Sequence, residues 1–315
     1  MTNIGYTLSS EERGPNTLVE NAVRAQEAGF GYALISDHFH PWTSTQGNAP
    51  FVWSALGAIA EATDALDVGT GVTCPTVRMH PAVTAHAVAT TAAMFDGRFF
   101  FGVGTGENLN EHVTGERWPP FDVRLEMLIE AVEIMRKLWT GENVTHRGDH
   151  YTVENARLFT LPEEPPPIYV SGTGPKSTRA ARDIGDGLVS TAPKESLVET
   201  FTETNDGPCY GQMTVCYAES ESEARKIAHE WWPNVALTGE LGQLLPTPKQ
   251  FEQAVEMVSE DDVAELVACG PDPDDHIEMI ETYADAGFDH VYVHQVGPDQ
   301  ERFFDFYENE ILPSY

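Results

Sequence analysis

The sequence has few cysteines and no long apolar segment. Its four cysteines, Cys74, Cys209, Cys216 and Cys269, form no CxxC pair, which argues against a disulfide framework or a thiol-redox motif. No run of about eighteen apolar residues occurs, so no transmembrane helix is expected. The N-terminus also lacks a basic segment followed by an apolar stretch. We therefore expect reduced thiols and a cytoplasmic protein.

Positive charge is scarce. Lys plus Arg total 18, only five of them lysines, against 50 Asp plus Glu, and the formal net charge is -32. This balance argues against a nucleic-acid or anionic-membrane partner, because both attract basic surfaces. The acids are spread along the chain and not gathered in one tail, which we interpret as adaptation to a salt-rich cytoplasm. An ordinary acidic surface is the alternative.

Two common hydrolase motifs are missing. The eleven histidines form no HExxH motif, and no GxSxG elbow is present, which argues against the usual zinc and serine hydrolases. Neither His80 with His86 nor His290 with His294 has an obvious cysteine or carboxylate cluster beside it, so we predict no metal site.

What the sequence does contain is an alternation of short apolar runs with amphipathic stretches. The runs that are typical of buried parallel strands are residues 3–8, 33–36, 68–72, 99–104, 168–171, 187–191, 213–217 and 290–294. The stretches between them have helical spacing, as in Leu125, Leu128 and Val132. Eight strand-then-helix units predict a TIM (β/α)8 barrel, with a doubly wound open sheet as the alternative. His290 and His294 would then point the same way, as barrel filling or helix contacts.

Two segments interrupt this alternation. Residues 141–167 predict a hairpin around Arg147-Gly148-Asp149 and end in three prolines, and residues 219–270 look wholly helical. No linker, internal repeat or low-complexity tract is visible. We therefore expect one domain over residues 1–315, with these two segments as insertions.

The loops after the second and fourth predicted strands carry candidate catalytic groups, and such loops form the active sites of parallel barrels. Ser36-Asp37-His38 places an acid beside an imidazole, a group that takes protons near neutral pH and that a carboxylate can orient. Residues 102–110 alternate glycines, which allow close approach of a flat ligand, and include Glu107 as a candidate proton donor. The alternative for His38 is a loop histidine that only forms hydrogen bonds with its neighbours. The alternative for residues 102–110 is a glycine turn that binds no ligand.

Two later loops suggest anion contacts. Ser171-Gly172-Thr173-Gly174-Pro175 opens a helix, whose free N–H groups and dipole suit a phosphate, although simple capping is the alternative. Lys194 follows the sixth predicted strand and is a candidate for a substrate anion, or else an exposed solubilising residue.

Taken together, residues 36–42, 102–110 and 172–175 resemble the luciferase-like F420-dependent oxidoreductases, especially the F420-dependent glucose-6-phosphate dehydrogenase group. The resemblance implies a TIM barrel of the bacterial luciferase-like type, a homodimer, and coenzyme F420 in the barrel mouth with its phosphate tail near Gly172 to Gly174. It also implies a non-proline cis peptide at Gly71-Val72.

The resemblance further implies residue roles. His38 would take a proton from the substrate hydroxyl while hydride passes to F420, Trp42 would steady the developing charge, and Glu107 would protonate the reduced ring. Cofactor contacts would come from Asp37, Gly71, Val72, Cys74, Thr105, Gly106, Asn110, Ser171, Gly172, Thr173 and Gly174, and substrate contacts from Thr191 and Lys194.

The implied reaction is dehydrogenation of a hydroxylated small molecule, with a sugar phosphate such as glucose 6-phosphate as the family's substrate. In that group a phosphate is held by the lysine after the sixth strand, matched by Lys194, plus two further cations. Between residues 241 and 286 only Lys249 and His276 are candidates, and Gln253 stands about where a lysine is expected. A secondary alcohol substrate, an FMN-dependent monooxygenase and a cofactor-binding protein without turnover stay open.

Overall fold

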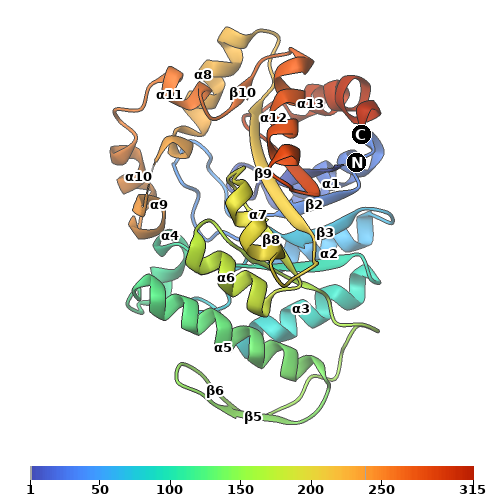
Figure 1. Cartoon of the computed structure of the whole chain (residues 1–315), viewed down its shortest axis with the longest axis vertical. Coiled ribbons are helices and arrows are strands. Elements are labelled where there is room, and N and C mark those ends of the chain that lie inside the picture. The colour runs from blue at the N-terminus through green and yellow to red at the C-terminus, as the bar shows by residue number, and fades with distance from the viewer. Residues whose placement is uncertain (1, 238) are drawn as a thin grey trace.

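The computed structural model describes residues 2–237 and 239–315, which form a closed barrel of parallel strands (Figure 1). The barrel strands are β1 (Asn3–Leu8), β2 (Tyr32–Ile35), β3 (Asp67–Thr70), β4 (Phe99–Val103), β7 (Ile168–Ser171), β8 (Gly187–Ser190), β9 (Cys209–Cys216) and β11 (His290–Gln295). They pair in this order, and β11 pairs with β1 to close the ring. The predicted TIM barrel is confirmed.

Helices between the strands cover the outside of the barrel (Figure 1). They are α1 (Pro15–Ala28), α2 (Val52–Ala62), α3 (Pro81–Phe95), α5 (Phe121–Trp139), α6 (Pro175–Ile184), α7 (Glu195–Thr202) and α12 (Pro273–Asp285). Several begin with proline at the first helical position, where its missing N–H costs nothing. Helix α1 also ends at Gly29, whose φ of 97° is the left-handed conformation that glycine adopts readily.

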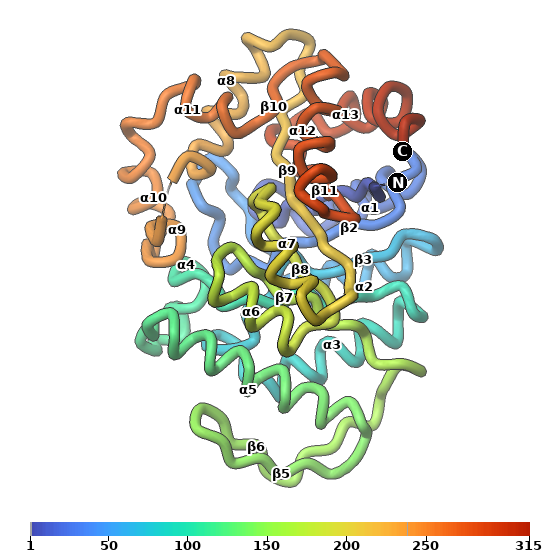
Figure 2. The backbone as a smooth tube through the Cα atoms, viewed as in Figure 1, coloured from blue at the N-terminus to red at the C-terminus, as the bar shows by residue number. Residues whose placement is uncertain are grey.

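The last helix brings the two ends of the chain together. It is α13 (Gln300–Phe306), which continues into η3 (Tyr307–Ile311) and η4 (Leu312–Ser314) and contacts α1. Figure 2 shows the two termini side by side. No helix within residues 2–237 and 239–315 is long and apolar enough to cross a membrane.

Large rings fill the interior of the barrel. A buried cluster joins Tyr32, Phe100, Tyr210 and Tyr292, and His290 stacks on Tyr210 with ring centroids 4.2 Å apart. The expectation that His290 fills the barrel is therefore confirmed. These rings fill the interior of the barrel, as the side chains of parallel barrels usually do.

The first interrupting segment contains the predicted hairpin. Strands β5 (Val144–Arg147) and β6 (Thr152–Ala156) are antiparallel, and Gly148 N donates to Tyr151 O at 3.0 Å. Figure 1 places this hairpin at the opposite end of the molecule from α8.

The second segment is largely helical. It contains α8 (Glu221–Trp231), η2 (Pro233–Ala236), α9 (Leu241–Leu244), α10 (Pro248–Ala254) and α11 (Glu260–Ala264). The prediction of a wholly helical segment is wrong at its end, where β10 (Ala268–Cys269) pairs with the end of β9. That end is free to pair because β8 reaches only Gly211 of β9. β9 also starts at Cys209, four residues before the predicted start at residue 213. The predicted strand began too late because Gly211 and Gln212 interrupt the apolar run of the sequence.

Candidate active site

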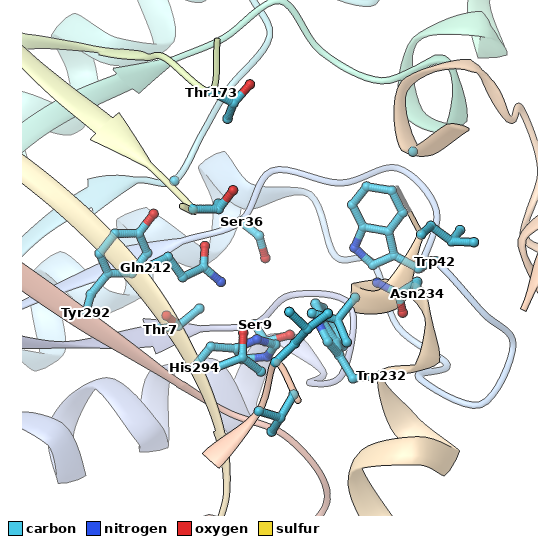
Figure 3. A pocket seen from close by; sticks show the side chains of 18 of the residues that line it. Thr7, Ser9, Ser36, Trp42, Thr173, Gln212, Trp232, Asn234, Tyr292 and His294 are labelled. Carbon is cyan, nitrogen blue, oxygen red and sulfur yellow. The ribbon is translucent and has the colours of Figure 1, made fainter. Parts of the chain in front are cut away.

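A cavity of about 930 Å³ opens at the carboxyl ends of the strands. Its volume is within the range of cofactor sites, which reach about 1,000 Å³. Figure 3 shows Tyr292 and Gln212 on one side of it, Trp42 and Asn234 on the other, and Ser36 between them. The predicted site residues that line it are His38, Trp42, Gly71, Val72, Thr105, Gly106, Glu107, Ser171, Thr173 and Thr191. The structure therefore brings the three predicted catalytic residues, His38, Trp42 and Glu107, to the same cavity.

The His38 ring is held by two contacts. Its Nδ1 lies 3.1 Å from the carbonyl oxygen of His40, which can only accept, so we assign the ring proton to Nδ1. Its Nε2 lies 3.3 Å from Oε1 of Glu11. The Glu11 carboxylate also can only accept, so the two contacts together suit the imidazolium, in which both ring nitrogens donate. In the neutral ring with its proton on Nδ1, Nε2 carries the lone pair that takes a proton, and Glu11 stabilises the imidazolium that results.

Glu11 also lines the cavity, although no local sequence pattern marks it as a candidate. It follows β1 and is buried, and its Oε2 accepts from the hydroxyls of Ser9 at 3.3 Å and of Ser36. Burial alone raises the pKa of this carboxyl. Attraction to the nearby His38 ring and the Ser36 hydrogen bond together outweigh that effect, so the net pKa lies below its usual value. Glu11 is therefore a carboxylate at neutral pH.

Asp37 does not orient His38, although it is adjacent in sequence. Its Oδ1 lies 2.8 Å from Nη2 of Arg78, and its Oδ2 accepts from Thr73 Oγ1 at 2.9 Å. Arg78 in turn lies beside Glu111, whose Oε2 accepts from Arg78 N at 2.7 Å. Burial raises the pKa of Glu111 to about 7, although Arg78 opposes the rise. This buried network is not part of the described cavity lining, and it ties the loop after β3 to Asp37 and Glu111.

Asn110 joins the two catalytic loops. Its Oδ1 accepts from the backbone N–H of Phe39 at 2.9 Å and of His40 at 3.2 Å, and its Nδ2 lies 3.4 Å from Oε2 of Glu107. Because the side chain is buried, these contacts position the His38 loop against the Glu107 loop. Glu107 itself caps α4 (Asn108–Glu111), which continues into η1 (His112–Thr114), and is half-buried at the cavity wall.

Trp42 forms the wall beside His38. Their ring centroids are 5.0 Å apart, and the Trp42 ring packs edge-on against Phe251 of α10 at 5.1 Å. The backbone N–H of Trp42 donates to Oε1 of Gln46, whose Nε2 donates to the backbone oxygen of Trp231. The helical segment thus covers this side of the site.

The backbone on the other side leaves room for a flat ring. The Gly71-Val72 peptide is cis, as the resemblance implied. A Cβ on Gly104 would come 2.8 Å from Val72 Cγ2 and 3.4 Å from Ser171 Cβ, so only glycine lets the end of β4 pack this closely against Val72. Gly71, Val72 and Gly104 all line the cavity, so backbone and small side chains form this wall, a surface that a flat ring can approach closely.

The predicted anion loop starts α6. Ser177 Oγ accepts from Thr173 N and Gly174 N, both at 3.2 Å, and Thr173 and Ser177 line the cavity. The described cavity lining does not include Asp37, Cys74, Asn110, Gly172, Gly174 or Lys194. Lys194 is exposed, and burial holds the pKa of the Cys74 thiol well above its usual value.

A second imidazole lines the cavity from β11. His294 Nε2 lies 2.8 Å from Oε2 of Glu12, both side chains are buried, and the His294 ring packs edge-on against Trp232 at 4.3 Å. His294 Nδ1 is buried without a hydrogen-bond partner among the described residues. Consecutive acids after β1, Glu11 and Glu12, thus each face one histidine. Within the described chain no group of side chains has the make-up of a metal site.

Comparison with known proteins identifies relatives along the whole chain. The family model for luciferase-like monooxygenases matches residues 1–290. The F420-dependent glucose-6-phosphate dehydrogenases of Intrasporangium calvum and Segniliparus rotundus are 37% and 38% identical, covering 99% and 98% of this chain and 98% and 97% of their own. An F420-dependent secondary alcohol dehydrogenase, solved with an F420-acetone adduct, has a TM-score of 0.92 at 32% identity, over 100% of this chain and 99% of its own. The chain therefore belongs to the luciferase-like monooxygenase family.

Proposed function

We propose that this protein is an F420-dependent dehydrogenase that oxidises the hydroxyl carbon of a small molecule. The observation that carries the proposal is His38 Nε2 beside the Glu11 carboxylate, in the same cavity as Glu107. The names of relatives that cover the full chain support the same cofactor and reaction class.

Each of these cavity residues would have its own role in the oxidation. When bound, F420 supplies a two-electron acceptor for the hydride that leaves the carbinol carbon. His38 Nε2 takes the hydroxyl proton, so that the alcohol becomes a carbonyl, and Glu11 stabilises the imidazolium that forms. Trp42, whose ring packs against His38, would steady the developing charge, and Glu107 in the cavity lining would deliver a proton to the cofactor.

The cradle of Gly71, Val72 and Gly104 would hold the ring, with Thr105, Gly106 and Ser171 at its edge. The start of α6, at Thr173 and Ser177, would hold the phosphate end through the positive end of the helix dipole, while the N–H groups of Thr173 and Gly174 donate to Ser177 Oγ. Asp37, Cys74 and Asn110 lie outside the described lining and would support the cofactor-binding loops indirectly. Thr191 lines the cavity and would contact the substrate.

The test is F420 reduction. Purified protein is mixed with F420 and a panel of alcohols and sugars in molar salt, and loss of the oxidised F420 absorbance is followed. His38→Ala is expected to lose at least about 100-fold in kcat, the usual scale for removal of a general base, while still binding F420. His150→Ala, on the hairpin, is the matched control. Copurifying FMN with oxygen consumption, or an unimpaired His38→Ala variant, would contradict the proposal.

We also propose a single-domain homodimer in a salt-rich cytoplasm, with no nucleic-acid or membrane partner. A formal charge of -32 spread over the chain supports the salt adaptation, because salt screens the repulsion among surface carboxylates. The urea midpoint should fall on transfer from molar to 0.1 M salt, and light scattering should give twice the chain mass. A salt-independent midpoint would contradict the first expectation, and a monomer the second.

A further inference from the structure

The outer part of the cavity is lined by carboxylates. They are Glu221 of α8, Glu265 at the end of α11, and Asp275 and Glu278 of α12, all exposed. Glu11 and Glu107 add two more acids deeper in the cavity. Among the lining residues of the described chain, Arg225 is the only lysine or arginine. A negative ligand group would thus meet many like charges and one cation.

That cation is already paired. Arg225 Nη1 lies 3.3 Å from Oε1 of Glu221, and its Nη2 donates to Oδ1 of Asp261. Two carboxylates therefore match its single charge, and an incoming anion would have to displace one of them.

The other cations that the sequence offered lie elsewhere. Lys194 and Lys249 are exposed and absent from the described lining. His276 is buried, with one ring nitrogen 3.0 Å from Gly270 O and the other 3.0 Å from the Tyr307 hydroxyl. Burial lowers the pKa of His276, which keeps it neutral. Among the residues that the structure describes, the cavity lining therefore lacks the set of cations that a phosphate dianion needs.

The deeper lining is rich in neutral hydrogen-bonding groups. Gln212, Thr214 and Asn234 line the cavity, and His294 has a buried Nδ1 without a partner in the described chain. Figure 3 shows Gln212, Asn234 and His294 around the same space. Such groups suit hydroxyls rather than charges, because they donate and accept hydrogen bonds without carrying a charge of their own.

On the basis of the proposed function, we propose that the substrate is an uncharged hydroxyl compound and that this site discriminates against phosphate esters. Repulsion by the acidic lining is screened in molar salt, where the Debye length is about 3 Å. By contrast, the described lining offers no unpaired lysine or arginine to contact a phosphate group, and this deficit is the same at any salt concentration. Discrimination is therefore expected to persist at high salt and to increase as salt is lowered.

The first test compares a matched pair, glucose and glucose 6-phosphate, with 2-propanol as a small neutral alcohol. With the F420-loaded enzyme in molar salt, kcat/KM for the best neutral compound should exceed that for the phosphate ester at least tenfold. An equal or higher kcat/KM for glucose 6-phosphate would overturn the inference. It would leave the dehydrogenase assignment intact, because F420 would still be reduced.

The second test does not need turnover. Inorganic phosphate is titrated into the F420-loaded protein by calorimetry at constant ionic strength, and no binding is expected below about 10 mM, whereas a site with several cations binds phosphate far more tightly. Saturable binding at or below 1 mM would overturn the inference, even if no alcohol were oxidised. Failure of every compound to reduce F420 would instead contradict the proposed function.

A charge-reversal variant tests the lining directly. Glu265→Lys should raise the ratio of kcat/KM for glucose 6-phosphate to that for glucose about tenfold at low salt, and Glu265→Gln should raise it less. Glu163→Lys makes the same charge change on an exposed residue outside the described lining. An equal rise in Glu163→Lys and Glu265→Lys would show that net charge, and not this lining, sets the ratio.

Discussion

Oε1 of Glu11 lies 3.3 Å from Nε2 of His38, which joins the loop after β1 to the loop after β2. The contact is buried, and Ser36 and Ser9 hold the other carboxylate oxygen. The imidazole therefore has a fixed orientation and a fixed negative neighbour. Both properties favour proton transfer from a substrate hydroxyl to Nε2.

Glu11→Gln tests this relationship. The amide keeps the shape but not the charge, so it does not stabilise the imidazolium, and we expect kcat to fall about 10- to 100-fold. Affinity for F420, measured by fluorescence quenching, should change less than about threefold. Glu20→Gln, on the exposed face of α1, is the control. A folded Glu11→Gln variant with the parent's kcat would contradict the assigned role.

The sequence predicts the barrel well and the site only in part. Strand runs, helical spacing and the loops carrying His38 and Glu107 are local patterns, and the structure brings these loops to one cavity. The partner of His38 could not be read locally, because Glu11 is distant in the chain and meets it only through the pairing of β1 with β2. Position was the one available signal, since Glu11 and Glu12 follow a predicted strand at the barrel mouth.

Asn110 shows the same limit. The resemblance implied a cofactor contact for Asn110, and no sequence pattern predicted that its side chain accepts from backbone groups of the His38 loop. The short strand β10 was missed because two residues carry no periodicity, and its pairing depends on where β8 ends. Contacts between distant segments decide these features.

Asn110→Ala should uncouple the two loops. It removes the acceptor of the Phe39 and His40 N–H groups, which lie on partly exposed residues where water can replace it, so the free energy of unfolding should fall by about 1 kcal/mol, the usual net value of a hydrogen bond. We expect kcat to fall at least about tenfold, because misplacement of catalytic groups by an ångström has effects of this size or larger. Urea denaturation and F420 reduction measure the two effects. Asn143→Ala, on the exposed hairpin, should change neither. Unchanged kcat in Asn110→Ala would show that the loops are positioned independently.

Gly102→Ala should disrupt the β3 and β4 edge of the cavity. A Cβ at Gly102 would come 1.9 Å from the backbone oxygen of Thr70, so a strand would have to shift. Overpacking of this kind costs about 1–3 kcal/mol or more in the free energy of unfolding. Gly31→Ala is the matched control, because nothing lies within 4 Å of its Cβ position. Equal urea midpoints for the two variants would contradict the steric argument.

Glu111→Gln should change how stability depends on pH. Burial raises the pKa of Glu111 from 4.5 to about 7, against the opposing effect of Arg78. A carboxyl with a raised folded-state pKa contributes stability that is fully present below pH 4.5 and is lost as pH rises through about 7. At 1.36 kcal/mol for each pKa unit, the loss between pH 5 and pH 8 is on the order of 2–3 kcal/mol.

The variant lacks this titration, so its free energy of unfolding relative to the parent should increase from pH 5 to pH 8 by about 2–3 kcal/mol. Urea denaturation at fixed molar salt, at several pH values, measures the difference, and the other carboxyls cancel because both proteins carry them. Gln can still accept from Arg78 N, and Arg78 keeps its ion pair with Asp37, which limits any loss that is independent of pH. Parallel pH profiles for parent and variant would mean that Arg78 keeps Glu111 ionised throughout this range and that burial does not dominate.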